Sequence, residues 1–415
     1  MPFFRKNSLT CRRKPKKDIG LIDAFEKIIN TSDFQARSTI LLKRALLAFY
    51  QRKLLSIPLL ASELGVSIPT AGRLAAILTS NHFVRLIGEG PSGGGRKPRI
   101  YQIDEQNWFT LAVDVGREHL RIALFNLNDQ KKAESISTLP LESSMQYLEA
   151  TVSHIKRFLV RHHLKPEQVL GIGFAVPGLI NTQTGRSLVH FTGFSRPVND
   201  MLADMTGIPV VMDNDARLMA KGEASFGKAQ HAQNAIYLFL DRGVGAGLLI
   251  NGEIYKGTHG FAGEFGHTHF LGNKNNMCYC GQTDCLETYT NLRALEEEAL
   301  RMGFTASATG DVWVNIIEAS WRGDRVAMDA IAEIGRRLGL ALVNLVHLID
   351  PEIIIIGGSL AMAGNVLTHS IYNTLRENAM HAFREDLRLE LSGMGQDACL
   401  AGCHAMVMKN FFANV

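Results

Sequence analysis

The sequence predicts an α/β protein in two parts, an N-terminal winged helix-turn-helix and a larger body of two α/β lobes. Three observations lead to this prediction: a helix-turn-helix phrase at residues 60–67, two strand–glycine turn–strand units in the body, and a dense cysteine cluster in its second half. The predicted boundaries are 1–36 for a basic arm, 37–105 for the winged helix-turn-helix and 106–415 for the body.

Charge is distributed unevenly along the 415 residues. Residues 1–105 carry 18 Lys and Arg against 8 Asp and Glu, which gives +10, whereas the remainder carries 26 against 32, which gives −6. A basic front end on an acidic body indicates a polyanionic partner at one end only. The alternative, a basic tail that is merely solvated, accounts for residues 5–17 but not for the rest of the excess.

The composition is that of a globular protein, with 46% hydrophobic and 20% charged residues. No apolar run reaches the roughly 18–20 residues that a membrane span needs, and the basic start of the chain lacks the apolar core of a secretory signal. Six cysteines, three of them clustered, favour a reducing compartment. We therefore expect a cytoplasmic protein without a membrane partner.

The basic arm, residues 1–36, is expected to be flexible, with a short helix around Ile19–Ile29. Three helices and two strands are expected to follow it, at Thr39–Lys53, Ile57–Leu64, Ser67–Ser80, Phe83–Ile87 and Ile100–Ile103. Ser56 is expected to cap the second helix, and the small residues Ala61 and Gly65 allow the second and third helices to cross closely. The glycine-rich hairpin at residues 88–99 completes a winged helix.

Double-stranded DNA is the partner expected for this N-terminal domain. The third helix would present Ser67, Thr70 and Arg73 to base edges and phosphates of the major groove. The cations of the hairpin suit a narrow minor groove, and they are Arg96, Lys97 and Arg99. A protein-interaction module is the alternative for three helices with a hairpin, but the turn, the hairpin and the local charge together favour DNA.

From Trp108 onward, predicted strands alternate with helices. The two repeated units are the strand pairs Phe109–Val115 with Arg121–Asn126, and Ala235–Leu240 with Gly247–Ile250. Further elements are the strands Val169–Ala175, Val210–Met212 and Glu352–Ile356, a helix ending near Gly222 and a long helix at Arg325–Ile349. The repetition indicates an actin-like (ribonuclease-H-like) pair of lobes with a cleft between them.

Cys278, Cys280 and Cys285 lie within eight residues of one another. This spacing suits Zn²⁺, which takes about four sulfur or nitrogen ligands in a tetrahedron. His267 is the expected fourth ligand and His269 is the alternative. Four protein ligands leave no position for a reactive water, so such a zinc would be structural. Reduced, buried thiols without a metal are the other interpretation.

Residues 263–267 (GEFGH) and 278–287 (CYCGQTDCLE) resemble the signature of the ROK family, which groups repressors, open reading frames and sugar kinases. The resemblance covers most of residues 108–412 and is strongest toward the winged-helix repressors. It implies an actin-like ATPase/sugar-kinase fold with a zinc knuckle that uses His267, Cys278, Cys280 and Cys285. The loop from His267 to Cys278 is one residue longer than is common in the family, which keeps His269 open as the ligand.

The same resemblance implies a sugar site in the cleft, formed by Gly178, Asn214, Asp215, Glu264, His267 and Glu287. Asp215 matches the general base of the family's kinases, yet a carboxylate there also serves as an acceptor for a bound sugar. Taken singly, each of these residues would suit a loop cap or a surface charge equally well. His190 stands where many of the kinases have asparagine.

Two turns depart from the kinase pattern of Asp-x-Gly-Gly-Thr and Gly-Thr-Gly-x-Gly-Gly-Gly. This chain reads DVGRE at 114–118 and DRGVGAG at 241–247, so Arg117 and Arg242 replace smaller residues, and Asp241 adds a negative charge. Such turns are poor cradles for the phosphates of Mg-ATP. They argue against ATP and Mg²⁺ as cofactors, although arginines suit a phosphate or a sugar phosphate.

The sequence thus predicts a sugar-responsive transcriptional regulator, a repressor, that binds an operator and a sugar or sugar phosphate. Ligand-driven closure of the lobes would change the relation between two DNA-binding heads in a homodimer or dimer of dimers. The alternatives are an ATP-dependent hexose kinase that carries a DNA-binding domain, with Asp215 as catalytic base, and a docking platform for another protein.

Overall fold

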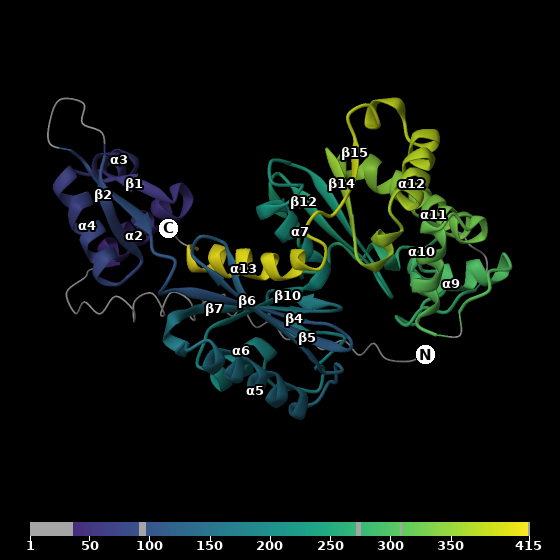
Figure 1. Ribbon diagram of the computed structural model, residues 1–415, viewed down its shortest axis with the longest axis horizontal. Coiled ribbons are helices and arrows are strands. Elements are labelled where there is room, and N and C mark those ends of the chain that lie inside the picture. Colours follow the sequence, from purple (N-terminus) through teal and green to yellow (C-terminus); the bar gives the residue numbers. More distant parts are fainter. Residues whose placement is uncertain (1–35, 91–96, 271–274, 308, 414–415) are drawn as a thin grey trace, which may run out of the picture. The chain divides into compact units, whose positions relative to one another are not determined.

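The structure is a computed structural model that describes residues 36–90, 97–270, 275–307 and 309–413. The chain divides into two compact units, and we describe each by itself (Figure 1). One unit extends to Ile103 and includes the chain end from Asn410, and the other is Asp104–Lys409. The predicted basic arm lies outside the described residues except for Ala36, which begins the first described helix.

The first unit contains the three helices and two strands expected from the sequence, within a few residues of their expected ends. Its elements are α2 (Ala36–Arg52), β1 (Leu54–Ser56), α3 (Ile57–Leu64), α4 (Ile68–Ser80), β2 (Val84–Glu89) and β3 (Arg99–Ile103). The sequence analysis did not anticipate β1, which pairs antiparallel with β3 and gives the sheet order β1-β3-β2. This short strand escaped prediction because three residues show no clear alternation.

Serine caps and a left-handed glycine define the path between α3 and α4. The Ser56 side chain accepts from the backbone N–H of Leu59, as predicted, and Ser67 accepts from Thr70. Gly65 ends α3 with φ 66° and ψ 36°, a conformation that costs little only for glycine. The helices therefore join through a tight turn.

The second unit is built on two five-stranded sheets of identical topology. In each, a strand pairs antiparallel with the next strand in sequence and parallel with a later one, which gives the orders β10-β7-β4-β5-β6 and β15-β14-β11-β12-β13. The first sheet contains β4 (Phe109–Val115), β5 (His119–Asn126), β6 (Lys131–Thr138), β7 (Val169–Val176) and β10 (Val210–Asn214). The second contains β11 (Ala235–Leu240), β12 (Val244–Ile250), β13 (Glu253–Ile254), β14 (Ile353–Gly357) and β15 (Arg388–Leu391). The predicted pair of repeated α/β lobes is thus present.

Helices cover both faces of each sheet, and most of them were not assigned from the sequence. They are α5 (Met145–Arg161), α6 (Val198–Thr206), α7 (Asp215–Phe226), α8 (Glu287–Thr290), α9 (Leu292–Arg301), α10 (Val312–Trp321), α11 (Arg325–Ile349), α12 (Asn365–Asn378) and α13 (Asp397–Phe411). A small hairpin of β8 (Ile180–Asn181) and β9 (Arg186–Ser187) and the short 3-10 helices η1 (Pro166–Gln168), η2 (Phe265–His267), η3 (Ser359–Ala363) and η4 (His381–Phe383) complete the unit.

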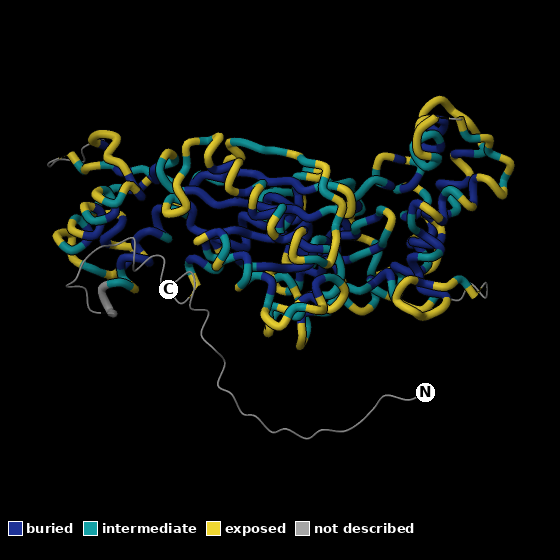
Figure 2. Tube along the Cα trace, turned by 90° about the horizontal axis from the view of Figure 1, so that it is seen from below, coloured by how far each residue is buried: buried dark blue, intermediate teal, exposed yellow. Residues whose placement is uncertain are grey.

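Alternation along the strands assigns each helix to a layer. Leu111 and Val113 of β4 face the cluster that contains α5 and α6, whereas Ala112 faces the cluster that contains α7 and α13. Ala235 and Tyr237 of β11 join that second cluster, so α7 and α13 lie between the two sheets. Figure 2 shows long buried stretches of the chain with more exposed segments around them.

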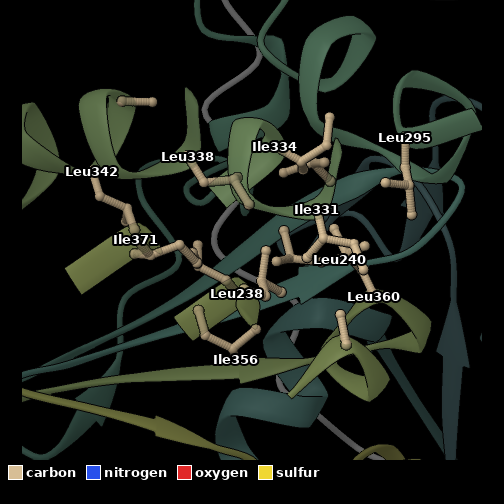
Figure 3. Close-up of a cluster of buried hydrophobic side chains, with 14 of the residues drawn as sticks. Leu238, Leu240, Leu295, Ile331, Ile334, Leu338, Leu342, Ile356, Leu360 and Ile371 are labelled. Atoms are coloured by element: carbon tan, nitrogen blue, oxygen red, sulfur yellow. The ribbon is translucent and has the colours of Figure 1, made fainter. Parts of the chain in front are cut away.

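The outer face of the second sheet carries an extensive apolar cluster (Figure 3). Ile331, Ile334 and Leu338, one face of α11, pack on Leu238 and Leu240 of β11 in this cluster. Their spacing of three and four residues is the helical period that places apolar side chains on one face of a helix. None of the helices in the described ranges is long and apolar enough to cross a membrane.

Helices α7 and α13 approach one another through glycine. A Cβ added to Gly402 would lie 1.8 Å from the carbonyl oxygen of Leu218, and one added to Gly222 would lie 2.1 Å from that of Ala398. Gly173 of β7 meets the backbone of Cys403 in the same way. Backbone atoms cannot move aside as flexible side chains do, so the layer between the sheets depends on these glycines.

Replacing Gly402 with alanine should therefore lower the free energy of unfolding of the body by about 1–3 kcal/mol or more, because overpacking forces a backbone shift. Gly72→Ala is the control, since its added Cβ would meet nothing within 4 Å, and alanine favours a helix by up to about 1 kcal/mol. The midpoints of urea unfolding measure both variants. An unchanged midpoint for Gly402→Ala would contradict the close packing.

Candidate functional site

The predicted zinc ligands converge on one point. Ligand atoms of His267, Cys278, Cys280 and Cys285 all lie within 4.8 Å of one another. The side chain of His269 is not part of this group, although its backbone forms an isolated β-bridge with Cys285. Among the described residues His267 is therefore the histidine that completes the set, and the extra loop residue does not displace it.

The spacing within this cluster fits a tetrahedral metal. The Nδ1 of His267 lies 3.6 Å from the Sγ of Cys278, and the Sγ atoms of Cys280 and Cys285 are 3.6 Å apart. With zinc–sulfur distances near 2.3 Å and zinc–nitrogen distances near 2.0–2.1 Å, the edges of a tetrahedron measure about 3.5–3.8 Å. One imidazole and three thiols in this arrangement could hold a metal such as Zn²⁺ through four protein ligands.

The other nitrogen of His267 faces the polar side of the loop. Its Nε2 lies 3.0 Å from the hydroxyl of Tyr279, and the Oε2 of Glu264 is 3.9 Å away. A histidine that uses Nδ1 for a metal carries its proton on Nε2, which a neighbouring oxygen then orients. Tyr279 was not singled out from the sequence, although its place between two cysteines of the cluster is a signal that could have identified it.

The thiols differ in acidity. Burial raises the pKa of Cys278 and Cys285, and the Cys278 thiol donates to the Oε1 of Glu287 at 3.0 Å. Burial also opposes ionisation of Cys280, but the backbone N–H of Gln282 and hydrogen bonds with the other two thiols lower its pKa. Metal binding requires the deprotonated thiolate, so Cys280 is the thiol most readily prepared for it.

Asn214 and Asp215 lie where β10 meets α7, and Gly178 lies beside them. The Oδ1 of Asn214 caps α7 by accepting from the N–H of Arg217, and its Nδ2 donates to the carbonyl of Gly178 at 3.1 Å and to Asp215 at 2.9 Å. The amide of Asn214 is thus engaged in holding the turn. Asp215 keeps its Oδ2 for a ligand, because only Oδ1 has partners in the described structure.

Burial first, and then the nearby carboxylates of Asp114 and Glu264, raise the pKa of Asp215 from 3.8 to about 7. Glu264 in turn has a pKa raised by burial and by the charge of Glu287. These interactions place Asp215, Glu264 and Glu287 in one acidic group. Near neutral pH Asp215 exists in both protonation states, so it can accept from a sugar hydroxyl or donate to it.

The structure therefore brings together all six predicted sugar-binding residues. Asn214 holds Gly178 and Asp215, Asp215 interacts with Glu264, and Glu264 interacts with His267 and Glu287. Asp114, at the end of β4, belongs to the same group, and burial raises its pKa. Carboxylates grouped with an imidazole and a tyrosine offer several hydrogen-bonding groups for the hydroxyls of one small polar ligand.

The second glycine-rich turn is shorter than predicted. Strand β12 begins at Val244 rather than Gly247, so Gly245 and Gly247 lie within the strand. Because they lack side chains, α7 can pack closely on the strand. A Cβ added to Gly245 would lie 2.9 Å from the Cβ of Ala216, and one added to Gly247 would lie 2.3 Å from the Cβ of Ala220. These glycines thus serve helix–sheet packing, which the sequence pattern does not distinguish from a phosphate-binding turn.

The carboxylate of Asp241 has partners within the protein. Its Oδ2 accepts from the N–H of Ser359 at 3.2 Å and from the hydroxyl of Ser359 at 2.5 Å, and its Oδ1 accepts from the N–H of Arg242. The negative charge expected beside a phosphate is therefore directed toward η3. Arg242 itself is exposed, and so is Arg117 at the end of β4.

A cavity of about 520 Å³ lies beside the cysteine cluster in the second unit. It shares Cys278, Tyr279 and Glu287 with the groups described above, and both arginines of the altered turns line it. The remaining residues come from the 276–277 segment and from α8, α9 and α10, and they are Asn276, Met277, Thr288, Asn291, Leu292, Arg293, Glu296, Glu297 and Trp313. The sequence analysis did not identify these residues, because they are brought together only by the fold.

Most predicted DNA-binding residues lie on the surface of the first unit. Ser67 and Thr70 form the first turn of α4, where their hydroxyls are 2.9 Å apart, and Arg73 is exposed one turn later. Lys97 and Arg99 are exposed at the start of β3. Arg96 lies outside the described residues.

Comparison with known proteins places this geometry in a family. The ROK family pattern matches residues 110–410, which is most of the chain. This chain belongs to the ROK family. A putative xylose repressor from Caldicellulosiruptor sp. (strain Rt8B.4) is 29% identical over 358 residues, which are 83% of this chain and 89% of the relative.

Solved ROK structures share the fold. A ROK family transcriptional regulator, a homolog of the Escherichia coli MLC protein, has a TM-score of 0.76 at 25% identity and covers 94% of this chain and 97% of its own. A ROK family glucokinase from Streptomyces griseus, in complex with glucose and AMPPNP, has a TM-score of 0.62 at 25% identity and covers 72% of this chain and 99% of its own. The actin-like two-lobed body of this ROK protein is thus shared with both regulators and sugar kinases.

Cys280→Ser should reduce bound zinc from about one ion per chain to a small fraction, because a hydroxyl is a poor replacement for a thiolate ligand. His269→Ala and Cys403→Ala are matched controls outside the cluster and should retain the metal. Elemental analysis of the purified variants by mass spectrometry gives the zinc content. Equal zinc in Cys280→Ser and the controls would show that the cluster does not hold the metal.

Asp215→Asn should change how stability depends on pH. Because the folded pKa is raised to about 7, the folded protein keeps this proton between about pH 4 and 7 after the unfolded chain has released it. Stability from this group is therefore lost as the pH rises through that range. We expect the variant to be about 1–2 kcal/mol more stable than wild type at pH 8, a value reduced for the partial exposure of the side chain.

Asparagine preserves the Oδ acceptor for Ala216, so the turn itself should persist. The measurement is urea unfolding of both proteins from pH 4 to 8. Any slope that remains in the variant belongs to other acids such as Asp114 and Glu264, whose pKa values are also raised. Parallel pH profiles for the two proteins would contradict the assignment.

Proposed function

We propose that this protein is a sugar-responsive transcriptional repressor that binds operator DNA through its first unit and a small sugar ligand in its second. One observation carries the proposal. The match to the glucokinase structure covers 99% of the glucokinase but only 72% of this chain. The match to the transcriptional regulator covers 94% of this chain. The ROK pattern begins at residue 110, after α2, α3 and α4, and the wider coverage by the regulator supports a resemblance that extends into the first unit.

The element order of the first unit supports a winged helix. Helices α3 and α4 are joined by the left-handed turn at Gly65, and the strands β2 and β3 that follow form an antiparallel pair. In helix-turn-helix proteins the N-terminal residues of the second helix meet base edges in the major groove. Ser67, Thr70 and Arg73 occupy that position here, and Lys97 and Arg99 provide positive charge at the base of the hairpin.

In this proposal the acidic group of the second unit binds the sugar, and Zn²⁺ at His267, Cys278, Cys280 and Cys285 fixes the loop that carries Glu264 and Tyr279. With four protein ligands the metal would supply rigidity rather than a reactive water. The sugar-binding residues would be Gly178 and Asn214 at the turn, and Asp215, Glu264, His267 and Glu287 around the ligand.

The protein would act as a homodimer or dimer of dimers in the cytoplasm, with two heads about 34–36 Å apart or a multiple of that distance on DNA. A ligand relieves repression only when it binds the DNA-incompetent arrangement more tightly than the competent one. Closure of the two lobes around the sugar is the motion that we expect to provide this difference.

Arg73→Ala should weaken specific DNA binding about ten- to hundredfold, the range lost with one good base contact. If Arg73 instead contacts a phosphate, binding falls for all sequences and the salt dependence decreases by about one unit. Arg325→Ala is the control, because that side chain is 92% exposed in the other unit. A mobility shift at stated salt, with DNA upstream of the protein's own gene and of neighbouring sugar genes, measures both variants.

The same assay, repeated with hexoses, amino sugars and their phosphates, tests the response to a ligand. Release of the DNA by one sugar would support the proposal and identify the effector. No specific DNA binding under any condition would contradict it. Hexose phosphorylation with Mg-ATP that is abolished by Asp215→Asn would instead favour the kinase alternative.

A further inference from the structure

The cavity of about 520 Å³ beside the cysteine cluster carries an unusual set of cations. Arg117 comes from the first lobe, and Arg242 and Arg293 come from the second, so three guanidinium groups from separate segments line one space. All three side chains are exposed to solvent at this surface. How far each arginine is available to a ligand depends on the carboxylates that pair with it.

The three arginines differ in how far they are neutralised. Arg117 has no ion pair within the described part of the chain. Arg242 lies 3.9 Å from Asp311, and both side chains are about 60% exposed, at 61% and 59%. Arg293 donates to Glu297 at 2.9 Å within α9. The exposed Arg242–Asp311 pair contributes little to stability at this distance. The guanidinium groups of Arg117 and Arg242 are therefore available to bind an anion.

The acids that line the cavity already have partners. Glu287 accepts from the thiol of Cys278, Glu296 accepts from the backbone N–H of Trp313, and Glu297 accepts from Arg293. Asp241, next to Arg242 in sequence, is held by Ser359 and does not line the cavity. These three carboxylates keep their charge and belong to α8 and α9, whereas the side chains that line the cavity from the two altered turns are the guanidinium donors of Arg117 and Arg242.

The cavity adjoins the candidate sugar residues. Glu287 and Cys278 line it, and Tyr279, which also lines it, contacts His267. The charge of Arg117 acts on His190 as well, where it adds to burial in lowering the pKa of that imidazole. A ligand that fills the acidic group could therefore extend an anionic substituent toward Arg117 and Arg242.

We propose that this cavity binds the phosphate of a phosphorylated sugar, with Arg117 and Arg242 as its principal ligands and Arg293 at its rim. Planar guanidinium groups form paired hydrogen bonds with phosphate oxygens, and several of them can share a dianion. This inference rests on the proposed function, because it names the chemical class of the effector of that site. It also gives the two bulky arginines of the altered turns a role in recognition.

Isothermal titration of the purified full-length protein tests the inference without DNA. The probes are a set of hexose and amino-sugar phosphates, their unphosphorylated parents, inorganic phosphate and ATP, at one ionic strength. Arg117→Gln and Arg242→Gln should each weaken the phosphorylated ligand about ten- to hundredfold, as expected for the loss of charge-assisted hydrogen bonds. The affinity for the parent sugar should change less than about twofold, and Arg325→Gln should behave as wild type.

Other outcomes would overturn the inference. A parent sugar that binds as tightly as its phosphate, or arginine variants that bind the phosphate ester normally, would leave the proposed repressor intact but remove the phosphate subsite. ATP bound more tightly than every sugar phosphate would reassign the cavity to a nucleotide. Specific DNA binding without affinity for any sugar or ester would contradict both this inference and sugar responsiveness, whereas loss of DNA binding alone would contradict only the repressor.

Discussion

The position of α7 between the two sheets is the constraint on which the site depends. Its close approach to α13 requires glycine at Gly222 and Gly402, and the glycines of β12 admit its alanines. Because the helix cannot shift, the residues at its N-terminus are fixed relative to both sheets. Asn214 caps this helix and holds Asp215 at the edge of the first sheet. The acidic group is therefore positioned by backbone packing and not by its own charges, which repel one another.

A buried ion pair secures the same turn. Arg217 is 1% exposed and lies 2.6 Å from Asp213, and Lys256 reaches Asp213 at 2.8 Å. These charges lower the pKa of Asp213 despite its burial, whereas Asp215, two residues later, has a raised pKa. The opposite pKa shifts distinguish the two aspartates. Asp213 is a structural carboxylate held by cations, whereas Asp215 is available to a ligand. The carbonyl of Ala262 also accepts from Arg217, which ties the turn to the segment before Glu264.

The cysteine cluster connects this acidic group to the cavity with the arginines. His267 reaches Tyr279 through one nitrogen and the thiols through the other, and Cys278 donates to Glu287. The cluster thus holds in place residues that belong to the acidic group and residues that line the cavity with the arginines. Under the proposed phosphate subsite, Arg117 and Arg242 of the two altered turns would bind the anionic substituent of the ligand on the cavity side of this cluster.

Local patterns in the sequence determined much of the fold. Helical periodicity predicted α2, capping residues predicted α3 and α4, strand patterns predicted β4 and β11, and the Cys-Tyr-Cys-Gly segment predicted the metal cluster, because each signal is complete within a few residues. The outer helices, β1, β6 and β15 were missed, since their apolar faces are interpretable only against the layer they cover. The start of β12 was placed at Gly247 instead of Val244, because glycine in a turn and glycine that packs against Ala216 within a strand look alike in the sequence. Three features were decided only by the tertiary structure. His267 rather than His269 joins the cysteines, the pKa of Asp215 is raised to about 7, and Arg117, Arg242 and Arg293 line one cavity. Each of these depends on distances between residues that are remote in sequence.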